Sequence, residues 1–401
     1  MSPDSLNLMQ LRAFINVVDH GSVSKAAAEM LRAQPVVTRA LHSLEQYLAV
    51  PLFERHPNGM LLTSYGKCIL PRARRVMAEL ATVAASVGHT SQRWQVPPYL
   101  LHTRRLEIFV RLCEMQHMQT VARLFGLSQP AISSAVKVLE SDTGCVLFDR
   151  AAQGLKPTRT GLDILMPIRR ALNEARRVRE DICAQAGALK GKVRVGALPL
   201  GRTAILPSAV AELIPQHPGV QVVTNESPFE MLALDLRAGD LDFIFGALRP
   251  SSYASDLIGE QLLTEQMVVL VGRGHPLVGR QVGIGDLKLA QWILPREGSP
   301  ARELFDANFH RVGSEAPPPV VETGDLAMIR GLLMRTHMLA AVSEHQLQHE
   351  ISSGELVRLA LELSDTHRAI GLTTRANGLH SPAAAVLMAL IRRSLVGHRV
   401  A

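Results

Sequence analysis

The chain has 401 residues, of which 47% are hydrophobic and 20% charged, and its formal net charge is +7. This composition is typical of a folded protein and excludes a disordered chain, and the length calls for two to four domains at about 150 residues each. No apolar run approaches the roughly 20 residues that cross a bilayer, and no secretory signal precedes the first elements. The four cysteines are widely spaced, which argues against a disulfide framework. We therefore expect a cytoplasmic protein with no membrane association.

The basic charge is concentrated in the first half of the chain. Residues 1–190 hold 24 Lys and Arg against 15 Asp and Glu, whereas the remaining residues hold 19 against 21. Lysine and arginine that face phosphates release condensed counterions, so a basic front half favours a polyanionic partner. A solvated basic surface is the alternative interpretation.

One small pattern occurs twice. Residues 11–66 align with residues 106–161 without a gap, with 14 identities in 56 positions. The matched residues stand at element starts, in the predicted cores and at turns, as in "AQPVVTRALHSLE" and "SQPAISSAVKVLE". We conclude that one small domain is repeated.

The second copy is predicted to be a helix-turn-helix. The helices "LEIFVRLCEM" and "TVARLF" precede a turn, and Ser128 can cap a third helix in which Pro130 costs no hydrogen bond. Ile132, Val136 and Leu139 then form one buried face. Two short strands around a glycine turn follow as a wing, and the second helix of such a motif can enter a major groove.

The first copy follows the same plan. Val37, Leu41 and Leu44 are predicted to lie inside, and Ala33 occupies the cap position, which we expect to weaken the helix start by about 1 kcal/mol. Glutamine can bind adenine and arginine can bind guanine through two hydrogen bonds, whereas hydroxyl, imidazole and ammonium groups suit phosphates or single base contacts. An ordinary polar helix face is the alternative. The candidate readers are Gln34, Arg39 and Gln129, with Thr38, His42, Ser133, Ser134 and Lys137 beside them.

The segment "FINVVDHGSVSKAAAEMLRAQPVVTRALHSLEQYLAVPLFER" and the following "LLTSYGK" resemble the LysR-type transcriptional regulators. The second copy keeps "LSQPAISSAVKVLESDTGCVLFDR" but reads "MQHMQTVA" where the family has Gly-Ser and paired alanines. Members of this family normally carry one winged helix-turn-helix, so the resemblance leaves open whether both copies bind DNA. By resemblance, recognition-helix contacts fall on Gln34, Pro35, Thr38 and Arg39, and on Gln129, Pro130, Ser133 and Ser134.

The two wings differ in their side chains. The first offers His56 and Asn58, and the second offers Gln153, Lys156 and Arg159. Arg55 and Arg150 either contact DNA or pin each wing to its recognition helix.

Two linker helices are predicted from matching apolar seams. Ile69 to Val87 and Leu165 to Leu189 carry apolar residues at alternating spacings of four and three, with Pro71 and Pro167 near the starts. Dimers of the family pair the linker helices of two chains. Since one chain here owns two, we also predict an internal pairing of its own two winged domains.

From Gly191 onward, strands alternate with helices, which predicts parallel sheets covered on both faces. This half resembles the effector domain of the family, which has two α/β lobes of periplasmic-binding-protein type. Ligands in such folds lie beyond the carboxyl ends of strands, near helix N-termini. The candidate effector residues are Leu200, Gly201, Arg202, Thr203, Ser227, Phe229, Gly246, Arg296 and Ser299, although each hydroxyl also suits a plain helix cap and each arginine a solvated surface.

Enzyme activity and metal binding are not predicted. His345 and His349 share a helical face but have no evident third ligand, and we find neither a nucleophile motif nor a nucleotide fingerprint. No cofactor is expected. We expect hydroxyls and free helix amides to bind a carboxylate or a hydroxylated metabolite. The stretches "WILPREGSP" and "IGLTTR" resemble regulators of sugar and aromatic-compound genes, which implies a sugar or an aromatic compound as effector.

The predicted fold is therefore multidomain, with two winged helix-turn-helix domains, their linker helices and a two-lobed α/β effector domain. The predicted function is a transcriptional regulator that binds double-stranded DNA as a homo-oligomer, a dimer or tetramer joined through linker helices and effector domains. One alternative is a small-molecule-binding protein whose winged domains only assist assembly, and another is a second copy that serves as a spacer. The predicted boundaries are 1–65, 66–88, 89–102, 103–160, 161–190 and 191–401, with lobe I at 191–265 and 365–401 and lobe II at 266–364.

Overall fold

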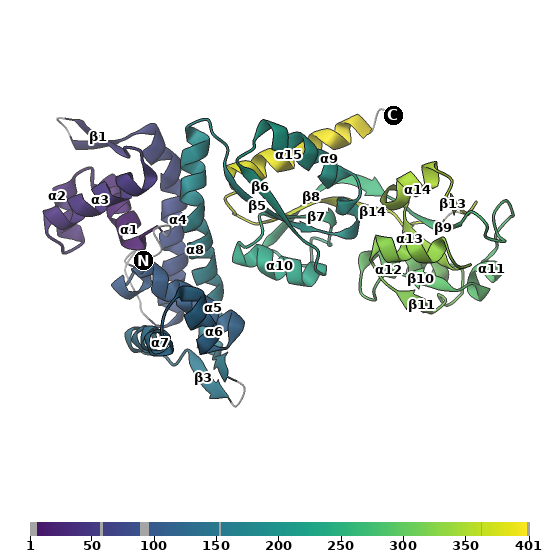
Figure 1. The fold of residues 1–401 in the computed structure, drawn as a ribbon, viewed down its shortest axis with the longest axis horizontal. Helices are drawn as coiled ribbons and strands as arrows, with labels where there is room; N and C mark the ends of the chain where they lie inside the picture. The colour runs from purple at the N-terminus through teal and green to yellow at the C-terminus, as the bar shows by residue number, and fades with distance from the viewer. Residues whose placement is uncertain (1–5, 57–58, 89–95, 152–153, 362, 399–401) are drawn as a thin grey trace. The chain divides into compact units, whose positions relative to one another are not determined.

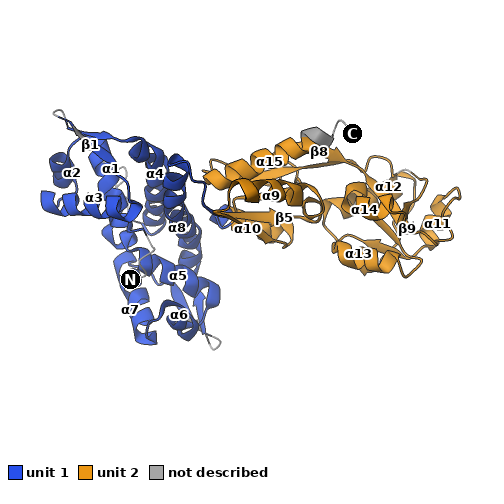
Figure 2. Cartoon of the chain, turned by 45° about the horizontal axis from the view of Figure 1, so that its top comes forward, with its two compact units in different colours: residues 1–191, 237–240 blue, residues 192–236, 241–401 orange. Residues whose placement is uncertain are grey.

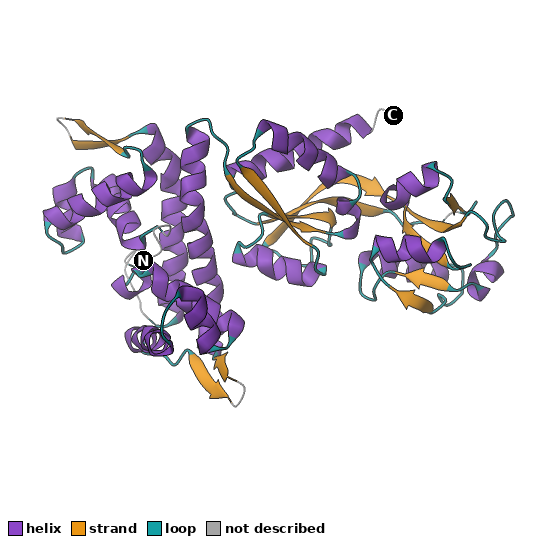
Figure 3. Ribbon diagram, viewed as in Figure 1, coloured by secondary structure: helices purple, strands orange, loops and turns teal. Residues whose placement is uncertain are grey.

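The structure, a computed structural model, describes residues 6–56, 59–88, 96–151, 154–361 and 363–398. The chain divides into two compact units, residues 1–191 with 237–240 and residues 192–236 with 241–401 (Figure 2). Helices dominate the first unit, and the second contains two five-stranded sheets (Figure 3).

The first winged head contains three helices and a two-stranded wing (Figure 1). The Asn7 side chain caps the first helix by accepting a hydrogen bond from the Met9 amide at 2.9 Å, and Gly21 ends that helix in the left-handed conformation. Apolar residues at helical spacing then bury one face of each helix. The elements are α1 (Leu8–His20), α2 (Val23–Glu29), α3 (Gln34–Leu48), β1 (Phe53–His56) and β2 (Gly59–Leu62).

The second winged head repeats this order. Ser128 Oγ accepts from the Ala131 amide at 3.4 Å, whereas Ala33 makes no side-chain cap, so the predicted difference between the two helix starts is confirmed. The elements are α5 (Thr103–Met115), α6 (Met118–Phe125), α7 (Gln129–Thr143), β3 (Phe148–Ala151) and β4 (Gly154–Pro157).

The unusual turn of the second head still forms. Gln116 takes the left-handed conformation (φ 54°) at the position that Gly21 (φ 65°) fills in the first head. In both heads the carbonyl of this residue accepts from the wing, from Met60 or from Leu155, at 3.0 Å. A glycine starts the second strand of each wing, Gly59 in β2 and Gly154 in β4. Glycine is needed there, because a Cβ on Gly154 would lie 2.4 Å from the Gln116 carbonyl oxygen.

Two long linker helices follow the wings, α4 (Ser64–Ser86) and α8 (Arg159–Gln185), and the short 3-10 helix η1 (Pro98–Leu101) precedes α5. Thr63 and Thr158 cap the two linkers in the same way, each accepting from a glycine amide at 3.1 Å. The predicted prolines lie inside these helices without dividing either one.

The linker helices pack against each other along their length within one chain (Figure 1). They run in opposite directions, since Arg72 contacts Asp181 while Glu79, further along α4, contacts Arg170, nearer the start of α8. The predicted seam is buried between them, except near its ends, where Ala186 is exposed beyond α8. The structure thus places the two linkers against each other within one chain, as the matched seams predict.

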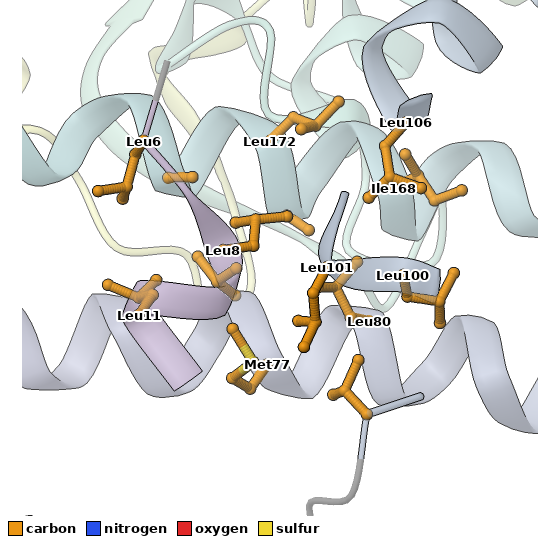
Figure 4. Packing of buried hydrophobic residues seen from close by; sticks show 14 of the residues in the cluster. Leu6, Leu8, Leu11, Met77, Leu80, Leu100, Leu101, Leu106, Ile168 and Leu172 are labelled. Carbon is orange, nitrogen blue, oxygen red and sulfur yellow. The ribbon is translucent and has the colours of Figure 1, made fainter. Parts of the chain in front are cut away.

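Equivalent residues of the two copies belong to one buried cluster beside the linker helices. Leu6 and Leu101, Leu11 and Leu106, and Met77 and Leu172 are pairs related by the same 95-residue shift, and all of them are buried in one cluster (Figure 4). The two heads and both linkers thus share a single hydrophobic core.

Lobe I of the second unit is a mixed sheet of strand order β6-β5-β7-β14-β8. β5 and β7 are parallel, whereas β14 is antiparallel to both of its neighbours. Its elements are β5 (Gly191–Ala197), η2 (Pro199–Arg202), α9 (Ile205–Gln216), β6 (Val220–Asn225), α10 (Phe229–Ala238), β7 (Phe243–Ala247), β8 (Leu257–Glu265), β14 (Arg368–Arg375) and α15 (Pro382–His398).

Lobe II has the order β11-β10-β12-β9-β13, and its core is centred on Trp292, Phe305 and Phe309. Its elements are β9 (Met267–Gly272), α11 (Ile284–Leu289), β10 (Trp292–Leu294), α12 (Pro300–Arg311), β11 (Pro319–Glu322), α13 (Leu326–Leu333), β12 (Leu339–Ser343), η3 (Glu344–Leu347), α14 (Gln348–Ser352) and β13 (Leu356–Arg358).

The expectation of purely parallel sheets is wrong. The chain crosses from lobe I to lobe II after β8 and returns before β14, and β9 and β14 lie antiparallel to their neighbours. A strand that enters a sheet from the neighbouring lobe has no crossover helix of its own, so the rule that links βαβ units to parallel pairing does not apply to it.

Candidate nucleic-acid and effector interfaces

The outward face of α3 carries every residue that the sequence predicts there. Gln34, Pro35, Thr38, Arg39 and His42 are exposed. Two of these side chains fold back along their own helix, since Thr38 Oγ1 donates to the Gln34 carbonyl at 3.1 Å and Arg39 Nε to the Pro35 carbonyl at 3.4 Å. These contacts are weak enough for a groove to replace them.

The equivalent face of α7 borders a hollow in the second winged head. Gln129, Pro130, Ser134 and Lys137 are exposed, and Ser133 is half-buried. Gln129, Pro130 and Ser133 line a hollow of about 690 Å³ together with the α5–α6 turn and the start of β4, namely Gln116, His117, Met118, Gln119, Gly154 and Leu155. The second head therefore presents a concave surface beside its recognition helix.

Only part of each predicted wing can be assessed. Lys156 is exposed on β4, and Arg159 lies not on the wing but at the start of α8, where its Nε is 3.2 Å from Asp163. His56 is exposed and lies 3.8 Å from Glu54. Asn58 and Gln153 fall outside the described residues, as do the side chains of Arg55 and Arg150.

A repeated glutamate fixes each wing to its recognition helix. Glu45 Oε1 accepts from the amides of Leu52 and Phe53 at 2.8 and 3.4 Å, and Glu140 Oε1 accepts from those of Leu147 and Phe148 at 2.8 and 3.2 Å. Hydrogen bonds from two backbone amides to one carboxylate are charge-assisted and therefore strong, so they hold the wing in place. Sequence reasoning considered only the arginines for this role, although the identity of the "LE" pair in both copies was the available signal.

Most predicted effector residues in lobe I have a structural role. Phe229 is buried, and its ring contacts Tyr253 and the guanidinium of Arg249. A Cβ on Gly201 would lie 2.7 Å from the Phe245 ring, and one on Gly246 would lie 2.4 Å from Leu198.

The predicted hydroxyls are occupied by local hydrogen bonds. Thr203 donates to the Leu200 carbonyl, Ser227 to Asn225 Oδ1 at 2.7 Å, and Ser299 to the Arg296 carbonyl while capping α12. Arg202 is half-buried and Arg296 is exposed. Leu200 is buried, so its side chain packs inside lobe I.

The two lobes meet at η2 and η3, which are in contact. Beside this contact, Glu265 lies buried at the crossover from β8 to β9, with its Oε1 3.2 Å from His345 Nδ1 and a hydrogen bond from the Ser343 hydroxyl. The hydrogen bond to Glu265 raises the pKa of His345. Arg368, at the start of β14, is 4.0 Å from the same carboxylate, and burial lowers its pKa. Sequence reasoning missed this group because its members are far apart in the chain.

Within the described residues, no cluster of three histidine, cysteine or acidic side chains is placed to hold a metal ion. No helix there combines the length and apolarity that a membrane span requires.

Both halves of the chain match models of known protein families. The model of the bacterial regulatory helix-turn-helix protein, lysR family, matches residues 8–67 and again 103–162, and the LysR substrate binding domain matches residues 186–396. The transcriptional regulator GalR of Pseudomonas putida is 59% identical over 96% of this chain and 97% of its own length. The chain belongs to the LysR family of transcriptional regulators.

A more distant relative and two solved structures are also similar to the chain. The regulator PcaQ of Agrobacterium fabrum is 28% identical over 73% of this chain and 94% of its own length. A full-length single-residue variant of OxyR from Pseudomonas aeruginosa has a TM-score of 0.54 at 24% identity, covering 72% of this chain and 94% of its own. CbnR, in a crystal structure of its complex with target DNA, has a TM-score of 0.53 at 22% identity, covering 73% and 99%.

As a LysR-type regulator, the chain joins a DNA-binding front half to an effector-binding domain. Its relatives are regulators and not enzymes, which decides against catalytic activity and against a chain whose winged domains only assist assembly.

Proposed function

We propose that both winged heads contact double-stranded DNA. The observation that carries this proposal is the pair of exposed polar faces on equivalent helices, α3 and α7, which keep the Gln-Pro start in both copies. The match to GalR runs over 387 residues and so spans both heads, which supports a role for the duplicated domain beyond that of a spacer.

Within each head, base contacts come from Gln34, Arg39 and Gln129, with single contacts from Thr38, Ser133 and Ser134. His42 and Lys137 lie where they can reach phosphates, and Pro35 and Pro130 fix the helix starts. From the wings, Asn58, Lys156 and Arg159 complete the proposed set. The salt link to Asp163 makes Arg159 the weakest of these candidates.

DNA affinity measured by fluorescence anisotropy at several salt concentrations tests this set. Arg39→Ala should relax base preference at one position by about 1–3 kcal/mol, whereas Lys156→Ala should weaken all sequences alike and reduce the salt slope by about one. Arg280→Ala, an exposed change in lobe II, is the matched control. Unchanged base preference in Arg39→Ala would remove this residue from the proposed readers.

Footprinting tests the second head. Gln129→Ala combined with Ser134→Ala should shorten the protected region on DNA if α7 reads bases. A footprint of unaltered length would show that the second head is a spacer.

We further propose that the effector binds where η2 faces η3, between the two lobes. Arg202, Thr203, Arg296 and Ser299 offer cationic and hydroxyl groups for a carboxylate or hydroxylated compound, and Ser227 lies at the start of α10. Leu200, Gly201, Phe229 and Gly246 support this region through packing. Titration calorimetry with sugar acids and aromatic carboxylates tests the class, and Arg202→Gln with Arg296→Gln should weaken binding of the charged compounds.

Effector binding should shift the equilibrium between two arrangements of the lobes, which requires unequal affinity for the two. Tight binding of a compound that leaves DNA affinity, DNA bending and transcription unaltered would contradict this mechanism.

The domain boundaries given under Sequence analysis and a cytoplasmic location, where DNA is accessible, are part of the same proposal. For homo-oligomers we favour contacts between effector domains. The edge strand β6 and the neighbouring α9 expose Val223 and Ile214, whereas the linker seams already bury each other within one chain.

A further inference from the structure

The interface between the two linker helices contains ion pairs that follow the internal repeat and one buried charged group that does not. Shifted by 95 residues, Arg75 corresponds to Arg170 and Glu79 to Glu174. Both resulting ion pairs are present, Arg75 with Glu174 at 3.7 Å and Arg170 with Glu79 at 2.8 Å. These pairs obey the repeat, so by themselves they would also hold two copies of either linker together.

One buried group breaks the repeat. Arg72 of α4 donates from Nε to Asp181 Oδ2 at 2.5 Å and from Nη2 to Asp181 Oδ1 at 3.0 Å, and it also bonds Glu174. Its side chain is only 4% exposed. The position equivalent to Arg72 is Pro167, and the position equivalent to Asp181 is Ser86.

This difference makes the two linkers complementary. Two copies of α8 packed in the same way would keep Glu174 opposite Arg170 but would bury Asp181 twice, with proline in place of its arginine. Two copies of α4 would bury Arg72 twice and offer serine in place of Asp181. A buried charge without its partner is strongly unfavourable, and the two-pronged contact to Asp181 needs arginine. Only the combination of α4 with α8 satisfies all three groups.

A second junction joins the heads away from the linker charges. Thr103, at the start of the second head, donates to the Leu6 carbonyl at 2.9 Å and accepts from the Leu8 amide at 3.4 Å. Arg12 of α1 donates to the Val96 carbonyl, just before η1, at 3.1 Å. The start of each head is therefore part of the other head's support.

We infer that each chain is a closed two-headed unit, in which Arg72, Glu174 and Asp181 direct α4 to pair with α8 and not with a second copy of itself. The apolar seam by which either linker helix could join a second chain is covered here by the other linker of the same chain. This inference does not depend on whether both heads contact DNA.

Cross-linking of the full-length protein tests the pairing. Glu79→Cys and Arg170→Cys place two thiols across the interface, in a background where Cys68, Cys145 and Cys183 are serine. Cys113 can remain, because burial raises the pKa of its thiol to about 12 and keeps it protonated. A short bis-maleimide should then give a product with the mass of one chain, at nanomolar and at micromolar concentration alike.

The single variant Glu79→Cys is the matched control, since it can be cross-linked only between chains and should give no product. A two-chain product from the double-cysteine protein, with a yield that rises with chain concentration, would overturn the inference. Because no DNA is present, failure of the proposed DNA contacts would leave this result unaffected.

The role of the charged group is tested in the same background by Arg72→Met with Asp181→Ser, which leaves the repeat-related ion pair of Arg75 with Glu174 in place. Unfolded and refolded at high concentration, this variant should give a several-fold larger share of two-chain product than the parent. The control, Arg74→Met with Asp19→Ser, removes an ion pair of 2.6 Å between half-exposed side chains and should behave like the parent.

Should the double variant fail to refold, as judged by circular dichroism, Arg72→Lys is the second variant. It keeps a cation but loses the two-pronged contact, so a smaller rise is expected. An unchanged share of two-chain product in whichever variant refolds would overturn the role assigned to the charged group. It would show that the segment between the two winged heads, residues 89–102, is enough to make α4 and α8 of one chain pair.

Discussion

Arg72 illustrates how one buried side chain can carry much of an interface. Hydrogen bonds and charges from Asp181 and Glu174 outweigh the effect of burial and raise its pKa. The cation is therefore present throughout the accessible pH range. Its removal would leave Asp181 buried without its hydrogen-bonding partner and Glu174 with the longer contact to Arg75.

We expect Arg72→Met to lower the unfolding free energy of the first unit by about 3–5 kcal/mol, the range for breaking a buried ion pair from one side. Arg74→Met, which breaks only the half-exposed pair with Asp19, should cost less than about 1 kcal/mol. Urea unfolding followed by circular dichroism measures both. Equal losses in the two variants would contradict the importance assigned to burial.

His345 makes the stability of the effector domain depend on pH. Its pKa is raised, first by the hydrogen bond to Glu265, so the protonated imidazole is favoured in the folded state. Its contribution is complete below the unfolded pKa of about 6.5 and is lost as pH rises through the higher folded pKa.

Accordingly, His345→Gln should lower the unfolding free energy at about pH 5.5 and have little effect at about pH 8.5. Because the imidazole is 63% exposed, solvent screening should keep the loss below about 1 kcal/mol. Urea unfolding at the two pH values checks the sign. A loss that grows with pH would show that His345 acts as the neutral ring.

At the scale of elements, the turn between α5 and α6 contains an avoidable strain. Gln116 is left-handed, a conformation that costs a residue with a Cβ roughly 1–2 kcal/mol, part of which glycine regains as chain entropy on unfolding. Gln116→Gly, which copies the first head, should therefore stabilise the second head by about 0.5–1 kcal/mol.

Thermal unfolding compares this variant with Gln119→Gly, a helical position in the same hollow where glycine should destabilise. A loss of stability in Gln116→Gly would mean that the glutamine side chain makes a contact worth more than the strain.

Much of the element pattern could be predicted from the sequence, because helix caps and apolar spacing are local signals. Ser128 caps α7, and Val37, Leu41 and Leu44 are buried, as their spacing indicates. Arg72 was not predicted, since seam spacing identifies apolar positions only. Its burial depends on carboxylates that lie about a hundred residues away in the chain.

The sequence predicted the candidate DNA-binding faces better than the candidate effector site, because only the former follow from local spacing. An exposed helix face follows from spacing, so the residues of α3 and α7 lie where they were expected. The effector residues were predicted from the rule that ligands bind beyond the carboxyl ends of strands. This rule locates the loops, but it does not tell which of their side chains are buried in the core. Phe229 and Gly246 consequently fill the interior of lobe I.

On the scale of the whole first unit, the shared core fixes the spacing of the two heads. Leu6, Leu101, Met77 and Leu172 belong to one buried cluster, so the heads cannot separate without exposing it (Figure 4). Close-packed cores resist such deformation.

If both heads read DNA, insertion of about five base pairs between their half-sites, which turns one by half a helical turn, should leave only one head bound. A deletion of the same length should act alike. Footprinting with the native spacing as reference measures the effect, and two protected half-sites in the lengthened DNA would show that the heads move independently.

The pairing of α4 with α8 inside one chain also has a consequence for evolution. In a regulator that joins two identical chains, one substitution in a recognition helix alters both halves of the operator at once, and the operator must stay palindromic. Here the helices differ, with Thr38 and Arg39 in one and Ser133 and Ser134 in the other. If both heads read DNA, each can change alone, so the promoter acquires a direction, and turning the operator around would exchange which head meets which half.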